Sequence, residues 1–277
     1  MAREGVLSKT RRSRLLASAL IGGLALTMSG CANFFDLETL DIQPQVSREG
    51  DRLQVEPLLR IAHTTRAQGD LVTAAGLYRR AHELAPKLTE PLLFLGFTLN
   101  QAGATAQAAD AFRRVLAIDS RNAEALRGLG LAMLHREEPE LALERFRAAL
   151  EIEEDVRLYN AMGVAYDMMG DHHGAHTLYY VGLDVDPENL SIRSNLGLSL
   201  ALAGYYGDAV TMLDQVARSP MATAEHRKTL ALAYGLAGDT DMAARTGRID
   251  MDEAAVAESL RYYEAVREIR QAPAAGS

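Results

Sequence analysis

The feature that most constrains the fold is a repeat of about 34 residues, which begins at Val55. Six repeats follow one another at steps of 34, 34, 33, 34 and 34 residues, and they cover residues 55–88, 89–122, 123–155, 156–189, 190–223 and 224–250. A repeat of this length cannot bury its apolar face alone, so neighbouring repeats must stack to form a continuous core. The sequence therefore predicts a stacked array rather than a two-layer α/β domain.

Three positions within the repeat indicate what each repeat folds into. The eighth position carries a small residue, and the twentieth position is always alanine: Ala62, Gly96, Gly130, Gly163, Gly197 and Ala231, then Ala74, Ala108, Ala142, Ala175, Ala209 and Ala243. Small residues at both positions allow two antiparallel helices to approach closely. The twenty-fourth position carries a large side chain in the first five repeats, Tyr78, Phe112, Phe146, Tyr179 and Leu213, but Gly247 in the sixth. Each repeat is thus predicted to be a helical hairpin filled by one large side chain, with the array decaying at the sixth repeat.

Turn residues mark the connections within and between these hairpins. Five repeats place a glycine between their two helical segments, where a left-handed residue is often needed: Gly69, Gly103, Gly170, Gly204 and Gly238. The third repeat has Glu137 at this point and starts its second helix near Pro139. Pro86 and Pro187 end the second helices of their repeats, because proline cannot continue the helical hydrogen-bond ladder.

This pattern resembles the tetratricopeptide repeat (TPR) and covers about 70% of the chain. The resemblance implies an all-α fold, a TPR superhelix (an α-solenoid of about six helical hairpins) that spans residues 55–250. Residues 251–270 are predicted to form a capping helix, with Asp252 at its N-terminus. Residues 271–277 are expected to form a disordered tail.

The N-terminal residues 1–30 have the features of a lipoprotein signal peptide. A basic segment precedes an apolar stretch of about 14 residues, Leu15–Met28, which is too short for a comfortable transmembrane helix. The tetrapeptide Met28–Cys31 resembles a bacterial lipobox and holds the only cysteine of the chain. We expect lipidation at Cys31, although an ordinary signal peptide followed by a coincidental cysteine is the alternative. Residues 31–54 are then the lipidated N-terminus and tether. The residue after the cysteine is Ala32 and not aspartate, and resemblance to proteobacterial lipoproteins then implies sorting to the outer membrane, on its periplasmic face.

Composition and motifs argue against several classes of function. The formal net charge of −8 disfavours a nucleic-acid partner and electrostatic docking on anionic lipid. A single cysteine excludes an intrachain disulfide and a zinc site with two thiolates. No P-loop, dinucleotide fingerprint or His-Glu-x-x-His motif occurs, so we expect no enzyme activity, no cofactor and no small-molecule substrate. His172 and His176 stand four residues apart, with His173 between them, as either a metal-binding pair or a solvated turn.

In TPR arrays the first helix of each hairpin lines the concave face. The fifth and ninth positions of the repeats from the second onward are expected there: Leu93, Arg127, Asn160, Ser194 and Lys228, then Phe97, Leu131, Val164, Leu198 and Leu232. The basic clamp of chaperone-type TPR domains is missing, because its positions hold Leu59, His63, Phe94, Glu124 and Gly128. We therefore predict binding of an apolar or amphipathic peptide segment. The predicted partner-binding residues are Leu93, Phe97, Arg127, Leu131, Asn160, Val164, Asn195 and Leu198.

Four stretches resemble a narrower group of proteins. They are LYNAMGVAYD at 158–167, NLGLSLALAG at 195–204, LALAYGLAGD at 230–239, and the segment Asp252–Tyr263. Together with the lipobox they are similar to TadD-type TPR lipoproteins of tight-adherence (Tad, Flp-pilus) systems. The resemblance implies a pilotin-like assembly factor whose partners are a secretin or other Tad pilus proteins. The alternative is a periplasmic TPR scaffold or regulator of a cell-envelope enzyme complex.

Overall fold

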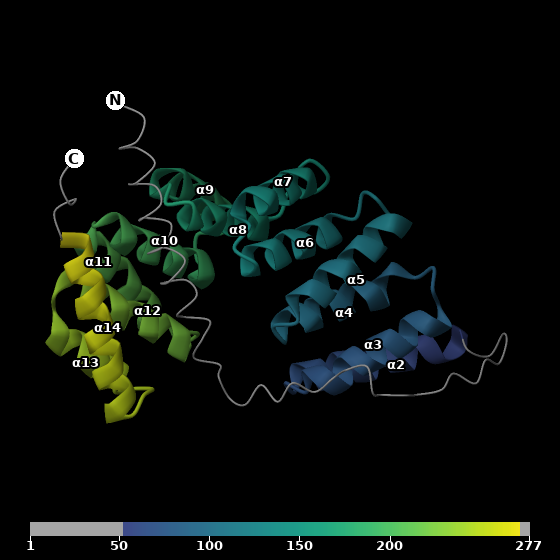
Figure 1. Ribbon diagram of the computed structural model, residues 1–277, viewed down its shortest axis with the longest axis horizontal. Helices are drawn as coiled ribbons and strands as arrows, with labels where there is room; N and C mark the ends of the chain where they lie inside the picture. Colours follow the sequence, from purple (N-terminus) through teal and green to yellow (C-terminus); the bar gives the residue numbers. More distant parts are fainter. Residues whose placement is uncertain (1–51, 272–277) are drawn as a thin grey trace. The chain divides into compact units, whose positions relative to one another are not determined.

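The computed structural model describes residues 52–271, and in this range the only regular elements are α-helices (Figure 1). The helices are α2 (Arg52–Ala67), α3 (Leu71–Leu84), α4 (Thr89–Gln101), α5 (Thr105–Ile118), α6 (Ala123–His135), α7 (Pro139–Leu150), α8 (Val156–Met168), α9 (His172–Val185), α10 (Leu190–Ala203), α11 (Tyr206–Ala217), α12 (Ala224–Ala237), α13 (Thr240–Gly247) and α14 (Glu253–Gln271). The all-α fold class is confirmed. The predicted signal peptide, Cys31, the predicted tether up to residue 51 and the predicted tail from residue 272 lie outside the described residues. No described helix is both long enough and apolar enough to cross a membrane.

The described chain divides into an N-terminal unit, residues 52–154, and a C-terminal unit, residues 155–271. In the N-terminal unit the hairpins are α2–α3, α4–α5 and α6–α7, and the first helices α4 and α6 contact each other. In the C-terminal unit the hairpins are α8–α9, α10–α11 and α12–α13, and α10 contacts both α8 and α12. First helices therefore lie beside first helices within each unit, as stacking of repeats requires.

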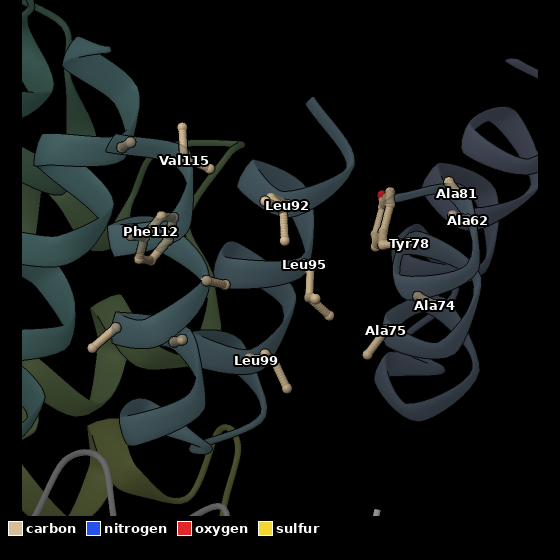
Figure 2. Packing of buried hydrophobic residues seen from close by; sticks show 14 of the residues in the cluster. Ala62, Ala74, Ala75, Tyr78, Ala81, Leu92, Leu95, Leu99, Phe112 and Val115 are labelled. Carbon is tan, nitrogen blue, oxygen red and sulfur yellow. The ribbon is translucent and has the colours of Figure 1, made fainter. Parts of the chain in front are cut away.

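The small and large positions of the repeat meet inside each hairpin. The alanines at the twentieth position are at most 2% exposed, and the side chains of Phe112 and Phe146 are fully buried. A Cβ added at Gly96 would lie 2.7 Å from the Phe112 ring, and one at Gly128 would clash with the same ring. Phe112, which Figure 2 shows among the buried residues of this core, therefore packs against the first helix of its own hairpin as well as that of the next repeat.

Short polar side chains set where many of the helices begin. In α3, Asp70 accepts a hydrogen bond from the backbone N–H of Thr73 at 3.0 Å, which satisfies one of the free donors at a helix start. Other helices use the same device through Asn122, Asp155, Asp171, Asn189, Asp239 and Asp252. At the N-terminal end α2 begins at Arg52, three residues before the first repeat counted from Val55.

All five turn glycines have a positive φ, between 78° and 93°. Glu137, the residue that replaces glycine in the third repeat, has φ 60°, and it is the only non-glycine residue with positive φ in residues 52–271. A side chain in this left-handed conformation costs roughly 1–2 kcal/mol, which glycine avoids.

We predict that Glu137→Gly raises the free energy of unfolding by about 0.5–1 kcal/mol, because relief of the left-handed strain exceeds the greater chain entropy of glycine. Urea unfolding followed by circular dichroism measures the effect. Gly103→Ala is the matched control: it introduces the same strain into the preceding hairpin, at φ 78°, and should destabilise the protein. A loss of stability in Glu137→Gly would contradict this account of the turn.

The C-terminal end of the array departs from the repeat. Helix α13 has only eight residues and ends at Gly247, where the other repeats carry their large side chain. Helix α14 packs against α12 and α13, and the Tyr263 ring lies directly over Gly235. Asp252 caps α14 by accepting a hydrogen bond from the backbone of Ala255 at 2.8 Å. One long helix thus covers the last hairpin.

Candidate partner-binding face

We call the half-buried residues at the positions predicted to bind a partner the first-helix face; part of it lies on α4 and α6 of the N-terminal unit, and part on α8 and α10 of the C-terminal unit. All eight residues predicted to bind a partner belong to it, four in each unit, and each is half-buried: Leu93, Phe97, Arg127, Leu131, Asn160, Val164, Asn195 and Leu198. Two other positions expected on the concave face lie elsewhere. Ser194 is 7% exposed and Leu232 is 1% exposed, so these two side chains belong to the core.

In the N-terminal unit the face is built around Phe97. The guanidinium of Arg127 lies over the Phe97 ring, 4.9 Å from its centroid, in a cation–π arrangement. Arg127 also donates a hydrogen bond of 2.6 Å to Glu124, while its Nε is buried with no hydrogen-bond partner. The inner edge of Phe97 meets the Phe112 ring at a centroid distance of 5.0 Å. Phe97 therefore joins the core on one side and is partly exposed on the other.

An aromatic cluster between α2 and α4 extends this face, and the sequence reasoning missed it. The His63 and Phe94 rings meet edge to face at 4.4 Å, and the Tyr78 hydroxyl is hydrogen-bonded to His63 Nδ1 at 2.7 Å. Arg66 lies over Phe94 at 5.5 Å, which gives a second arginine–phenylalanine pair. His63 and Phe94 occupy positions of the chaperone clamp. Their identities show that the basic clamp is missing, but they do not by themselves indicate that the two rings contact each other.

In the C-terminal unit the face carries an amide pair. Asn195 Nδ2 donates a hydrogen bond of 2.8 Å to Asn160 Oδ1, which joins α10 to α8. The half-buried side chains of Val164 and Leu198 follow one turn later on the same helices. Beyond this bond, Asn160 keeps its two amide N–H donors, and Asn195 keeps its Oδ1 acceptor and one N–H donor. An extended peptide backbone presents groups complementary to both.

The C-terminal unit holds a buried carboxylate where α8, α9 and α10 meet. Asp167, which is 4% exposed, accepts hydrogen bonds from the Tyr179 hydroxyl at 2.9 Å, from Ser199 Oγ at 2.5 Å and from His172 Nδ1 at 2.7 Å. Burial, followed by the charge of Asp167, raises the pKa of Tyr179 well above its ordinary value, so the phenol stays protonated and donates. These bonds connect α8, α9 and α10.

The three histidines of α9 differ in their burial and in their hydrogen bonds. His172 is half-buried and bonded to Asp167, so it is not part of a solvated turn, whereas His173 is exposed. Desolvation lowers the pKa of His176, whose Nε2 is buried without a hydrogen-bond partner. Within residues 52–271 no group of three potential metal ligands comes together.

No protein-family model matches the sequence, and no curated protein matches it significantly. Solved structures do match. A tetratricopeptide repeat protein from Parabacteroides merdae aligns with 76% of this chain and 85% of its own, at a TM-score of 0.65 and 18% identity. The chain has the TPR fold.

Two further solved structures match. PilF of Pseudomonas aeruginosa aligns with 78% of this chain and 99% of its own, at a TM-score of 0.59 and 19% identity. PilW, described as a widely conserved type IV pilus biogenesis factor, aligns with 75% of this chain and 97% of its own, at a TM-score of 0.64 and 18% identity. At these identities the likeness concerns the TPR fold alone.

Proposed function

We propose that this TPR protein is a non-enzymatic outer-membrane lipoprotein that binds other proteins and acts as a pilotin-like assembly factor of the Tad/Flp pilus apparatus. The TadD-like stretches of the sequence support this proposal, and so does the fold shared with PilF and PilW. A secretin or another component of the pilus machine is the proposed partner.

The first-helix face is the observation that carries the proposal. Its members are half-buried: they are held in place by the core but keep part of their surface free for a partner. Phe97 and Leu131 offer apolar contacts, and Asn160 with Asn195 offers N–H donors and an Oδ1 acceptor to a peptide backbone. Aromatic residues and arginine are enriched at protein interfaces, which fits the Arg127–Phe97 pair. Within each unit, an amphipathic segment of a partner has the chemistry to satisfy the groups of that unit.

We expect Phe97→Ala to weaken capture of the secretin about tenfold or more, since a well-buried aromatic anchor contributes about 2 kcal/mol at an interface. The melting temperature should fall by only a few degrees, because the ring is half-buried. Pull-down and thermal melts of the same preparations measure both effects.

The matched control is Tyr180→Ala, which removes an aromatic ring that is 52% exposed on the second helix α9. This variant should capture the secretin as well as wild type. Unchanged capture by a folded Phe97→Ala, Val164→Ala double variant would place the binding site off the first-helix face. Capture of a cell-wall hydrolase in place of the secretin would support the alternative of a cell-envelope scaffold.

Lipidation at Cys31 anchors the protein in this proposal, because two or three acyl chains hold a protein stably where one chain does so only marginally. Cys31→Ser should abolish metabolic acyl labelling and release the protein from the outer-membrane fraction. A serine variant that still takes up label and remains with outer membranes would rule this anchor out.

A further inference from the structure

Basic residues recur in register on the second helices of the first two hairpins. Arg79 and Arg113 share position 25 of the repeat, Arg80 and Arg114 share position 26, and Lys87 and Arg121 share position 33. We call this set the basic ridge: Arg79, Arg80, Lys87, Arg113, Arg114 and Arg121. Both of its hairpins belong to the N-terminal unit.

The ridge side chains lie on other sides of their helices than the buried side chain of each repeat. Positions 25 and 26 follow the buried side chain at position 24, Tyr78 or Phe112, by about 100° and 200° around the helix. Four of the ridge residues are exposed and the other two, Arg79 and Arg80, are half-buried. A hydrogen bond of 2.7 Å from Arg114 Nη2 to His82 Nε2 joins α5 to α3, so the two halves of the ridge are adjacent.

Acidic side chains do not neutralise the ridge. Across residues 71–88 and 105–122, the second helices and the loops that follow them, six basic residues stand against three acidic ones, Glu83, Asp110 and Asp119. Glu83 pairs with Arg80 at 3.2 Å, and Asp119 caps a turn by accepting from the backbone of Arg121. Arg79 and Arg113 have no ion-pair partner among the described residues.

The C-terminal unit has the opposite balance at the same places. Residues 172–189, which comprise α9 and its following loop, contain three acidic residues and neither lysine nor arginine: Asp184, Asp186 and Glu188. Position 25 holds Tyr180 and Asp214 in its first two repeats. The formal net charge of −8 by itself disfavours contact with anionic lipid. It is a sum over the whole chain, however, and does not show that basic residues gather on α3 and α5 while acidic residues gather at 172–189.

We propose that the basic ridge is a docking surface for anionic phospholipid headgroups. Charge complementarity favours such a surface, and the position of the ridge in the chain favours a membrane over other polyanions. Only 20 residues lie between Cys31 and Arg52, so the 21 steps from one to the other span at most about 75 Å when the chain is extended. A lipid on Cys31 therefore keeps the hairpins that carry the ridge close to the membrane. The closeness of the ridge to the membrane rests on the proposed lipidation of Cys31, whereas the positive charge of the ridge does not depend on it.

Docking through the ridge has a consequence for partner binding. Because the ridge lies on second helices and their following loops, whereas Phe97 and Arg127 lie on the first helices α4 and α6, contact with headgroups leaves these two side chains accessible. The acidic C-terminal unit is repelled by the same surface. The membrane thus orients the protein and does not compete with its protein partner.

The test uses the processed chain from residue 31 with Cys31→Ser, so that no acyl chain contributes, and measures cosedimentation with vesicles. Vesicles of phosphatidylcholine with about 30 mol% phosphatidylglycerol should bind the protein at low ionic strength, and pure phosphatidylcholine should not. Each basic side chain at an anionic surface contributes about fivefold, so Arg79→Glu, Arg113→Glu should reduce binding by at least tenfold. About 0.5 M salt should abolish binding by screening.

The matched control is Arg245→Glu, Arg261→Glu, which makes the same change in net charge at exposed positions of the C-terminal unit. It should bind vesicles to within twofold of the unmodified protein. An equal loss in both double variants, binding to pure phosphatidylcholine, or no binding by the unmodified protein would overturn the proposal. Secretin capture by Arg79→Glu, Arg113→Glu should stay at the wild-type level, so failure of the ridge and failure of the first-helix face are distinguishable.

Discussion

Phe112→Ala is expected to lower the free energy of unfolding by about 3–5 kcal/mol, as truncation of a large aromatic side chain in a packed core does. The Phe112 side chain is fully buried, and its ring fills the space left by Gly96 on its own hairpin and by Gly128 on the next. Removing the ring opens a cavity between α4, α5 and α6. The two glycines cannot fill this cavity, because they have no side chains.

Thermal and urea unfolding measure this effect, with Phe97→Ala as the matched comparison. Phe97 contacts Phe112 but is half-buried, so its truncation should cost clearly less than that of Phe112. Equal destabilisation by the two variants would mean that Phe97 is a core residue, and the first-helix face would lose its proposed aromatic anchor.

Asp167→Ala is expected to destabilise the C-terminal unit by about 2–4 kcal/mol. The substitution leaves the Tyr179 hydroxyl and Ser199 Oγ buried without their acceptor, and each unsatisfied group costs about 1–3 kcal/mol. Tyr179→Phe removes only one donor and should cost about 1 kcal/mol. A double-mutant cycle of the two positions isolates the hydrogen bond between them.

If Asp167→Ala and Asp167→Asn both leave the melting temperature unchanged, the three hydrogen bonds to this carboxylate do not stabilise the protein. The link from α8 to α9 and α10 would then come from apolar packing alone, through contacts such as that of Tyr179 with Gly163.

The repeat register predicted the parts of the fold that depend on local pattern. Alanine at position 20 and glycine at position 8 required close helix contact, and the structure has Ala74 and Ala108 fully buried at such contacts. Glycine in the turns predicted left-handed backbone, and even the exception at Glu137 adopts it. These features follow from sterics within one hairpin, so the sequence of a single repeat is enough to predict them.

The candidate site depends on contacts between repeats, which the register alone does not predict. Ser194 and Leu232 share repeat positions with half-buried residues, yet neighbouring helices bury them in the C-terminal unit. The cluster of Arg66, His63 and Phe94 joins two repeats. Asp167 and Ser199 lie 32 residues apart and meet only through stacking. Which side chain reaches a given partner is decided by tertiary packing.

Site-specific photo-crosslinking in cells can show whether the first-helix face holds the partner. A photoreactive phenylalanine analogue placed at Leu131 or Leu198 samples the face, and the same group at Val72 or Tyr180, each 52% exposed on a second helix, samples the opposite side of the hairpins. We expect crosslinks to a secretin or another pilus component from Leu131 and Leu198 only. Crosslinks to such a component from Val72 or Tyr180, with none from Leu131 or Leu198, would contradict it.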